Sequence, residues 1–319
     1  MAEKIACMTM LRDEPFFLPI WFRYYSQLFG AENLYILDND SVQPVAQMLL
    51  PGQAPEQLNI TRVPRLSEGD RKANAPFDQQ RFAMISGMIS GLLAYYDRVI
   101  FNDTDEVFIA NPAKYPDLSA YLNAKASRFP ITAGIGLELF HDTATEEPLD
   151  ITRPILAQRR HVQYLPLYSK PHVIATRCRI WPHSADRPFT LDPDLMLVHM
   201  KYVDQDHLRH RQAQRQAKAG AKAHGMGNNW QRDEDEALTS LRRLNERRPA
   251  QTGFDPNAIM RDVYGKAGPA SVGPEQELPP VRPPRGERIR VWDCLEKEVE
   301  KALISERHRL PDIYEATGL

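Results

Sequence analysis

The sequence predicts an α/β fold in which a mostly parallel sheet is flanked by helices and followed by a helical carboxyl-terminal extension. In the amino-terminal half, short apolar runs of strand length alternate with segments of helical periodicity. Residues 5–11 are almost continuously apolar, which is typical of a strand buried on both faces of a parallel sheet. Three apolar runs end in clusters of charged and amide side chains, and ligands bind at such strand ends in parallel sheets.

Each element follows from a local pattern. The first helix carries aromatic and apolar residues at spacings of three and four and ends at Gly30. The second helix has the same spacing, and the strands are rich in β-branched and aromatic residues. The expected order is a strand at residues 5–11, a helix at 15–29, strands at 34–37 and 58–63, a helix at 79–93 and a strand at 99–101.

Composition limits the class of protein. With 319 residues, of which 42% are hydrophobic, the chain is long enough to bury a large core. The net charge of -2 argues against a dedicated nucleic-acid binder, which would carry a basic excess. The three cysteines are odd in number and widely spaced, which favours a reducing compartment over a disulfide framework or zinc ribbon. Without a secretory signal pattern or a membrane-spanning run, the sequence predicts a cytosolic protein.

The most informative stretch begins where the strand at 99–101 meets a run of acidic residues. Asp103 and Asp105 are two positions apart, so in extended backbone their carboxylates point to the same side. Because the two negative charges repel each other, we expect a cation beside them, and a hard divalent ion such as Mn²⁺ or Mg²⁺ suits carboxylate and phosphate oxygens. The alternative is a solvated loop with an Asx turn.

Two earlier strands also end in polar residues. Arg12, Asp13 and Glu14 follow the first strand, and Asp38-Asn39-Asp40-Ser41 ends the second. Because the carboxyl ends of parallel strands meet at one edge of the sheet, these clusters should converge with Asp103 and Asp105 on one crevice.

In this order, MLRDEPFFLPIWFRYYSQLFGAENLYILDNDS and YYDRVIFNDTDEVFIANP resemble the family-two-like nucleotide-sugar glycosyltransferases, which have the GT-A fold. Those enzymes carry an Asp-Asn-x-Ser after the second strand and an Asp-x-Asp-Glu after a later one. The resemblance implies a Rossmann-like GT-A domain at residues 1–205. Residues 206–319 would add a basic helical segment, a Pro-rich linker and a terminal helix on or beside that domain.

The resemblance also implies a nucleotide-sugar donor, a glycan or other hydroxyl acceptor, and a divalent metal. Asp103 would lie nearer the ribose and Asp105 would ligate the metal, with His199 as the third ligand and His183 as the alternative to His199. Lys72 would reach the diphosphate, unless it is an ordinary surface lysine. The implied donor-binding residues are Arg12, Glu14, Asp38, Lys72, Asp103 and Lys170, and the implied metal ligands are Asp103, Asp105 and His199.

Two further residues are candidates for catalysis. Glu138 stands in an apolar strand, 131–140, whose glycines allow close backbone approach. If it faces the crevice, burial should raise the pKa of its carboxyl and suit it to take a proton from an acceptor hydroxyl; the alternative is the solvated face of an edge strand. His183, in a Trp-Pro-His-Ser turn, is the second candidate. His199 lies on the apolar strand 195–200, where a lone histidine is commonly a hydrogen-bonded core residue.

The carboxyl-terminal third is rich in charge and proline. Residues 207–224 are basic and predict a helix that forms a solvated surface or a lid. An alternative role is contact with an anionic acceptor glycan or with anionic lipid at the inner face of a membrane. The other expected elements are a helix at 233–248, a stiff Pro-rich segment at 268–286, an edge strand at 289–292 and a helix at 294–308.

The sequence therefore predicts a metal-dependent, inverting glycosyltransferase, and the inversion rests on the resemblance alone. One rival is a haloacid-dehalogenase-like phosphatase with Asp103 as nucleophile and Asp105 as acid and base. That fold needs a later Gly-Asp pair, and the Gly-Asp pair here, at 69–70, lies upstream. The other rival is a non-catalytic nucleotide-sugar binder on the same scaffold.

Overall fold

A computed structural model describes residues 2–53, 55–65, 77–125, 130–218, 234–264, 281 and 290–319. Lys72 and the Gly-Asp pair at 69–70 lie outside the described residues. So do residues 219–224 of the basic segment and most of the Pro-rich segment.

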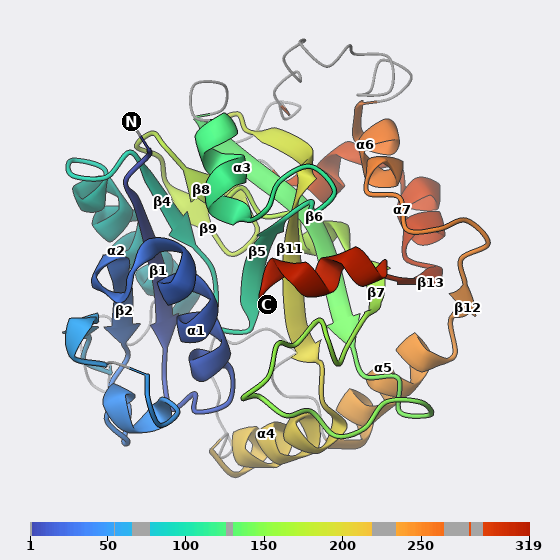
Figure 1. The fold of residues 1–319 in the computed structure, drawn as a ribbon, viewed down its shortest axis with the longest axis horizontal. Helices are drawn as coiled ribbons and strands as arrows, with labels where there is room; N and C mark the ends of the chain where they lie inside the picture. Colours follow the sequence, from blue (N-terminus) through green and yellow to red (C-terminus); the bar gives the residue numbers. More distant parts are fainter. Residues whose placement is uncertain are drawn as a thin grey trace.

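A large mixed sheet runs through the molecule, and its amino-terminal half is parallel (Figure 1). β1 (Ile5–Leu11) pairs in parallel with β2 (Leu34–Asp38) on one side and with β4 (Arg98–Phe101) on the other. β3 (Asn59–Arg62) extends this half as the next parallel neighbour of β2. The α/β class and the parallel amino-terminal strands predicted from the apolar runs are confirmed.

Helices cover both faces of this parallel half. All seven residues of β1 are buried, as its unbroken apolar character predicts. α1 (Phe17–Phe29) and α2 (Phe77–Leu92) belong to crossovers that run in opposite directions along the sheet, so right-handed connections place them on opposite faces. α1 buries the indole of Trp21 completely and ends at Gly30, whose φ is 83°. The aromatic stripe of α1 is therefore core.

The carboxyl-terminal half of the sheet is built around β11 (Thr190–Tyr202). β11 pairs in parallel with β6 (Ile131–Phe140) and antiparallel with β5 (Glu106–Ala110). β6 also pairs antiparallel with β7 (His161–Tyr164) and with β8 (Val173–Ile174). Because β8 pairs antiparallel with β4 as well, it joins the two halves into one sheet.

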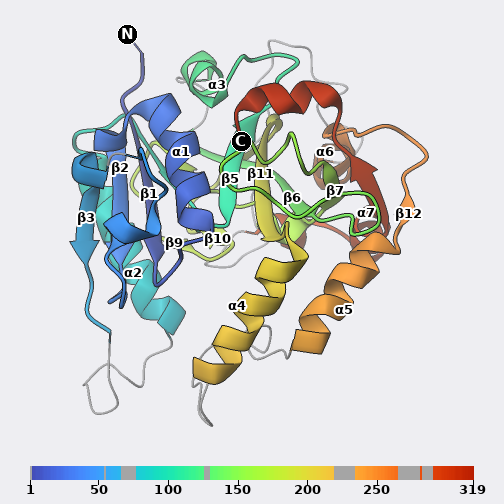
Figure 2. The same ribbon diagram turned by 60° about the horizontal axis from the view of Figure 1, so that its bottom comes forward.

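The carboxyl-terminal residues extend the same sheet. β13 (Glu306–Arg309) pairs antiparallel with β7, and β12 (Arg248–Pro249) pairs with β13. α4 (Gln205–Lys218) and α5 (Glu234–Asn245) lie side by side beyond the end of β11 and share a small apolar cluster with it (Figure 2). The remaining elements are α3 (Leu118–Ala124), α6 (Asn257–Tyr264), α7 (Lys297–Leu303), the hairpin of β9 (Ile180–Trp181) and β10 (Ser184–Ala185), and 3-10 turns at Ala31–Asn33, Val45–Met48, Pro55–Gln57, Pro166–Tyr168, Val291–Cys294 and Asp312–Thr317.

Two predictions near the carboxyl terminus are wrong. In the described part of the edge strand expected at 289–292, residues 291–292 belong to the 3-10 turn Val291–Cys294, and the helix expected at 294–308 is limited to Lys297–Leu303. Residues 306–309 form β13 because β7 offers an unpaired edge to them. Such a pairing is a tertiary preference that local helical periodicity does not reveal.

Gly136 lies where the segment after β7 crosses β6. A Cβ at Gly136 would lie 2.4 Å from the carbonyl oxygen of Leu165 and 2.5 Å from the carbonyl carbon of Tyr168. The amide of Gly136 donates to the hydroxyl of Ser169 at 3.0 Å. The expectation that glycines in this strand allow close backbone approach is confirmed, and the crossing fixes the segment that carries Tyr168 and Lys170.

We expect Gly136→Ala to lower the free energy of unfolding by about 1–3 kcal/mol, because the added methyl group meets backbone that has to shift. Thermal or urea unfolding measures the change. Gly87→Ala in α2 is the matched control: its Cβ meets nothing within 4 Å, so the substitution should raise the stability by about 0.5–1 kcal/mol. A Gly136→Ala protein as stable as the wild type would contradict the crossing.

Candidate functional site

The loops that follow β1 and β2 are tied to each other. The amide of Asp13 donates to the hydroxyl of Ser41 at 3.0 Å, and a carboxylate oxygen of Asp13 accepts from the amide of Val42 at 2.7 Å. Asp13 and Asp40 have φ values of 47° and 58°, a left-handed conformation that non-glycine residues seldom adopt. Strain of this kind is commonly found where loops are held in position at functional sites.

Asp38 and Arg12 lie beside these loops. Asp38 is buried at the end of β2, and its carboxylate accepts from the amide of Ser41 at 2.9 Å. Arg12 is partly exposed, with its Nε 3.7 Å from the carboxylate of Asp13. Both residues are at the strand ends where the sequence places them, and their roles in donor binding stay predictions.

The turn between β4 and β5 carries the Asp-x-Asp sequence and is held from both sides. Asn102 is fully buried; its side chain accepts from the indole of Trp21 at 3.3 Å and donates to the backbone oxygen of Glu106. The amide of Glu106 donates to the backbone oxygen of Asp103 at 3.0 Å. The acidic stretch is therefore a fixed turn at the sheet edge and not a solvated loop.

Asp105, Glu106 and His199 form a cluster of potential metal ligands. One ligand atom from each, a carboxylate oxygen or an imidazole nitrogen, lies within 4.8 Å of the others. Strand pairing creates the cluster, because His199 on β11 stands opposite Glu106 on β5. Sequence reasoning identified Asp105 and His199 and missed Glu106. Its position directly after the Asp-x-Asp was the available signal.

Glu138 lies on the other side of His199. It stands opposite His199 across the β6–β11 pairing, and its two carboxylate oxygens lie 2.8 and 3.0 Å from Nδ1, which donates to them. Nε2 of His199 then lies 3.8 Å from a carboxylate oxygen of Asp105. The ring of Tyr168 stacks on the imidazole at a centroid distance of 3.9 Å. These contacts direct the second ring nitrogen of His199 toward Asp105.

Burial and charge shift the pKa values of this pair. Burial raises the pKa of Glu138, and the opposing effect of His199 does not cancel it. Burial lowers the pKa of His199, but Glu138 and Asp105 outweigh burial and raise the pKa above 6.5. The rise in the pKa of Glu138 follows the sequence expectation. Its carboxylate is nevertheless directed at His199, and its side chain is only 3% exposed.

Two cations neutralise the carboxylates on the β4 side. Arg81 from α2 forms an ion pair with Asp103, and Nζ of Lys170 lies 2.5 Å from Glu106 and 3.6 Å from Asp103. Burial alone would raise the pKa of Asp103, but Arg81 and Lys170 hold it well below its usual range. Burial raises the pKa of Glu106 to about 7, against the attraction of Lys170. Lys170 therefore lies at the site, and its role in donor binding stays a prediction.

Arg211 on α4 joins two of the three strand ends. Its Nη2 lies 2.9 Å from the carboxylate of Glu14, and its Nη1 lies 3.2 Å from that of Asp105. With the links between the first two loops, this contact confirms that the three polar clusters converge. Sequence reasoning included Arg211 in a basic surface helix and did not consider Arg81, because neither helix pattern shows where its cations point.

His183 lies close to the site but outside the ligand cluster. Its ring contacts Tyr168 edge-on at 5.8 Å and stacks on Trp292 at 6.0 Å. Burial lowers the pKa of His183 to about 2. Within the described residues the cluster contains His199 and not His183, and a catalytic role for His183 stays a prediction.

The donor set suits a hard divalent cation. Oε2 of Glu106 is buried and has no hydrogen-bond partner among the described residues, so it has an unused lone pair at the cluster. The two carboxylates supply the oxygen ligands that Mn²⁺ and Mg²⁺ prefer, and His199 adds one nitrogen ligand, with the remaining positions open to phosphate or water. The residues present therefore fit a metal that also binds a diphosphate.

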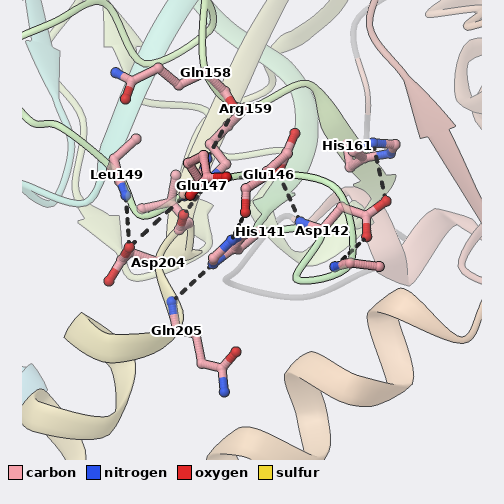
Figure 3. A network of polar contacts seen from close by, with 12 residues as sticks. His141, Asp142, Glu146, Glu147, Leu149, Gln158, Arg159, His161, Asp204 and Gln205 are labelled. Atoms are coloured by element: carbon pink, nitrogen blue, oxygen red, sulfur yellow. Dashed lines mark hydrogen bonds and ion pairs between the residues drawn. The ribbon is translucent and has the colours of Figure 1, made fainter.

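A separate polar network fixes the beginning of α4 (Figure 3). The guanidinium of Arg159, 1% exposed, donates to the backbone oxygen of Val203 at 2.8 Å and lies 3.9 Å from Asp204. Asp204 accepts from the amide of His207 at 2.7 Å, which caps the helix. Because the start of α4 is fixed in this way, the helix holds the backbone of Arg211 where its guanidinium can reach Glu14 and Asp105.

Comparison with known proteins gives no family assignment. No protein-family model matches the sequence, and no curated protein sequence is similar to it. Among the described residues, no helix has both the length and the apolar character needed to cross a membrane. The function is therefore inferred from the site.

We expect the contribution of Glu106 to the stability of the metal-free protein to fall as pH rises from 4.5 toward 7, while buried histidines with a lowered pKa, such as His183, act in the opposite direction. A raised pKa means that the folded state prefers the protonated carboxyl, so this contribution is complete below 4.5 and is lost through pH 7. Glu106→Gln should remove that part of the slope, measured by urea unfolding with a chelator present. Glu298→Gln, at an exposed position of α7, is the control and should keep the wild-type slope. Identical slopes in all three proteins would contradict the assignment.

Proposed function

We propose that the protein is a metal-dependent glycosyltransferase, which transfers a sugar from a nucleotide-diphosphate donor to an acceptor hydroxyl with inversion. The observation that carries the proposal is the cluster of Asp105, Glu106 and His199 at the end of the parallel half of the sheet. Asp103, which the sequence resemblance implies as a further ligand, lies in the same turn but outside this cluster. The proposal joins this cluster to the sequence resemblance described above.

The sheet supports a GT-A-type scaffold. The parallel strands β3, β2, β1 and β4 precede the Asp-x-Asp turn, and the antiparallel pair of β5 and β11 follows it. The turn lies at the junction between these two halves, of which the first would bind the nucleotide and the second would hold the acceptor. Asp38, at the end of β2, would accept a hydrogen bond from the base or ribose of the donor.

The proposed chemistry is a direct displacement at the anomeric carbon. A divalent cation bound by Asp105, Glu106 and His199 would supply positive charge near the departing diphosphate. Lys170 and Arg81 hold Asp103 in place and add positive charge to the same region. Positioned cations stabilise a charge that develops in the transition state without reorganising when it forms.

Glu138 is better placed to position His199 than to act as the general base. A base has to reach the acceptor hydroxyl, whereas both oxygens of Glu138 contact His199 inside the sheet. A carboxylate behind a ligating histidine fixes its tautomer and strengthens it as a ligand. The role of Glu138 as a general base stays a prediction. Measuring Mn²⁺ affinity distinguishes this role from that of positioning His199.

We expect Glu138→Gln to weaken Mn²⁺ binding by about 10- to 100-fold, as is typical when the partner of a ligating histidine is changed. Isothermal titration with Mn²⁺ measures the dissociation constant. If Glu138 were only the base, Mn²⁺ affinity would be unchanged and turnover at saturating Mn²⁺ would fall. Glu146→Gln is the control and should leave Mn²⁺ affinity unchanged, because this partly buried glutamate belongs to the network at the start of α4.

We expect a nucleotide sugar to raise the melting temperature only when Mn²⁺ or Mg²⁺ is present. At about 100 times its dissociation constant, a ligand stabilises the folded state by about 2.7 kcal/mol. A thermal-shift screen of uridine, guanosine and cytidine diphosphate sugars makes the measurement. Asp105→Asn should abolish the metal-dependent shift, whereas Asp206→Asn, at an exposed site on α4, should preserve it.

Two outcomes would count against a glycosyltransferase. Hydrolysis of p-nitrophenyl phosphate would favour a phosphatase, although both oxygens of Asp103 contact cations and are poorly placed to attack phosphorus. Metal-dependent binding of a nucleotide sugar without turnover of any donor, across a broad acceptor panel, would favour a non-catalytic binder.

A further inference from the structure

Arg211 shares a carboxylate oxygen with the candidate metal site. Its Nη1 lies 3.2 Å from Oδ2 of Asp105, and the same oxygen faces Nε2 of His199 at 3.8 Å. A cation held between Asp105 and His199 would therefore use an atom that already contacts a guanidinium. Two positive charges on one carboxylate oxygen repel each other strongly where the surroundings are largely buried.

The other cations at the site are held differently. Arg81 pairs with Asp103, and Lys170 lies closest to Glu106 through Oε1, while Oε2 of Glu106 has no hydrogen-bond partner among the described residues. A metal can therefore reach Glu106 without displacing Lys170. Arg211 differs because its contact is with the oxygen of Asp105 that faces His199.

The backbone of α4 is anchored near Arg211. If a metal binds Asp105, it is therefore the side chain of Arg211 that has to move, and not the helix. Asp204 caps the helix, and the ring of His207 stacks on Phe16 at a centroid distance of 3.6 Å. Nη2 of Arg211 contacts Glu14 at 2.9 Å. An arginine that loses one carboxylate and keeps the other can present its remaining N–H groups to a new acceptor nearby.

We propose that Arg211 supplies the positive charge beside Asp105 when the metal is absent and moves to a phosphate of the donor when the metal binds. The proposal rests on the proposed function, because it takes the donor to be a nucleoside diphosphate. A guanidinium presents paired N–H donors that match phosphate oxygens. The metal and the diphosphate would therefore bind cooperatively, with Arg211 as the residue that links them.

This arrangement has a defined thermodynamic signature. In the wild type, Mn²⁺ alone has to displace Arg211 from Asp105, which weakens its binding. A diphosphate gives Arg211 a new partner, so it should raise Mn²⁺ affinity, and Mn²⁺ should raise diphosphate affinity by the same factor. Removing the guanidinium of Arg211 should remove its competition with Mn²⁺ for Asp105 and also the coupling between Mn²⁺ binding and diphosphate binding.

The test compares Mn²⁺ binding to the wild type and to Arg211→Gln by isothermal titration, with Mn²⁺ alone and with UDP or GDP present. We expect Arg211→Gln to bind Mn²⁺ alone about 10-fold more tightly, and the increase in Mn²⁺ affinity caused by the nucleotide to fall by at least about 5-fold. Arg211→Lys keeps the charge, so its affinity for Mn²⁺ alone should stay near the wild-type value. If Arg211→Gln folds poorly, Arg211→Lys tests the link: it lacks the paired N–H donors, so the effect of the nucleotide on Mn²⁺ affinity should fall, and an unchanged effect would contradict the proposal.

Arg209→Gln is the matched control on the same helix. Arg209 contacts Asp206 at 3.1 Å at the exposed surface, so its loss should change neither Mn²⁺ affinity nor the effect of the nucleotide. Equal Mn²⁺ affinity in the wild type and Arg211→Gln would overturn the inference and leave the proposed function standing. Absence of Mn²⁺ binding in both proteins would overturn the metal site itself, and the inference with it.

Discussion

The site depends on the register of three neighbouring strands. Glu106, His199 and Glu138 stand opposite one another on β5, β11 and β6, so their side chains lie on the same face of the sheet. Because side chains alternate between the two faces, a slip of one residue would turn His199 away from both glutamates. The aligned stretch of β11 lies between two irregularities in its pairing with β6, after Asp192 and after His199. The pairing is therefore regular where the ligands stand.

Charge balance is the second constraint on the site. Four carboxylates gather at the ends of β1, β4 and β5, and buried charges are costly unless they are paired. Three cations from three different parts of the chain balance them: Arg81 from α2, Lys170 from the segment that crosses Gly136, and Arg211 from α4. The close crossing at Gly136 therefore also affects the charge balance, because it fixes the segment from which Lys170 reaches Glu106.

The sequence revealed the parts of the site that depend on strand ends. Apolar runs that stop in acidic clusters are local patterns, so the convergence of the first two loops with Asp103 and Asp105 could be predicted. The contributions of Arg81 and Arg211 could not, because they depend on which way a helix faces. Glu106 had a signal in its position after the Asp-x-Asp, but its contact with His199 depends on the pairing of β5 with β11. Glu138 shows the same limit: its burial was one of two alternatives that the sequence left open, and its contact with His199 follows from the pairing of β6 with β11.

The carboxyl-terminal extension is part of this balance. α4 follows directly after β11 and supplies the guanidinium that faces Glu14 and Asp105, while β13 extends the sheet beyond β7. A chain that ended before α4 would leave those two carboxylates without Arg211 at the edge where the strands converge. Repulsion between them would then favour separation of the loop after β1 from the turn after β4. The helix therefore contributes to the shape of the site as well as to its charge.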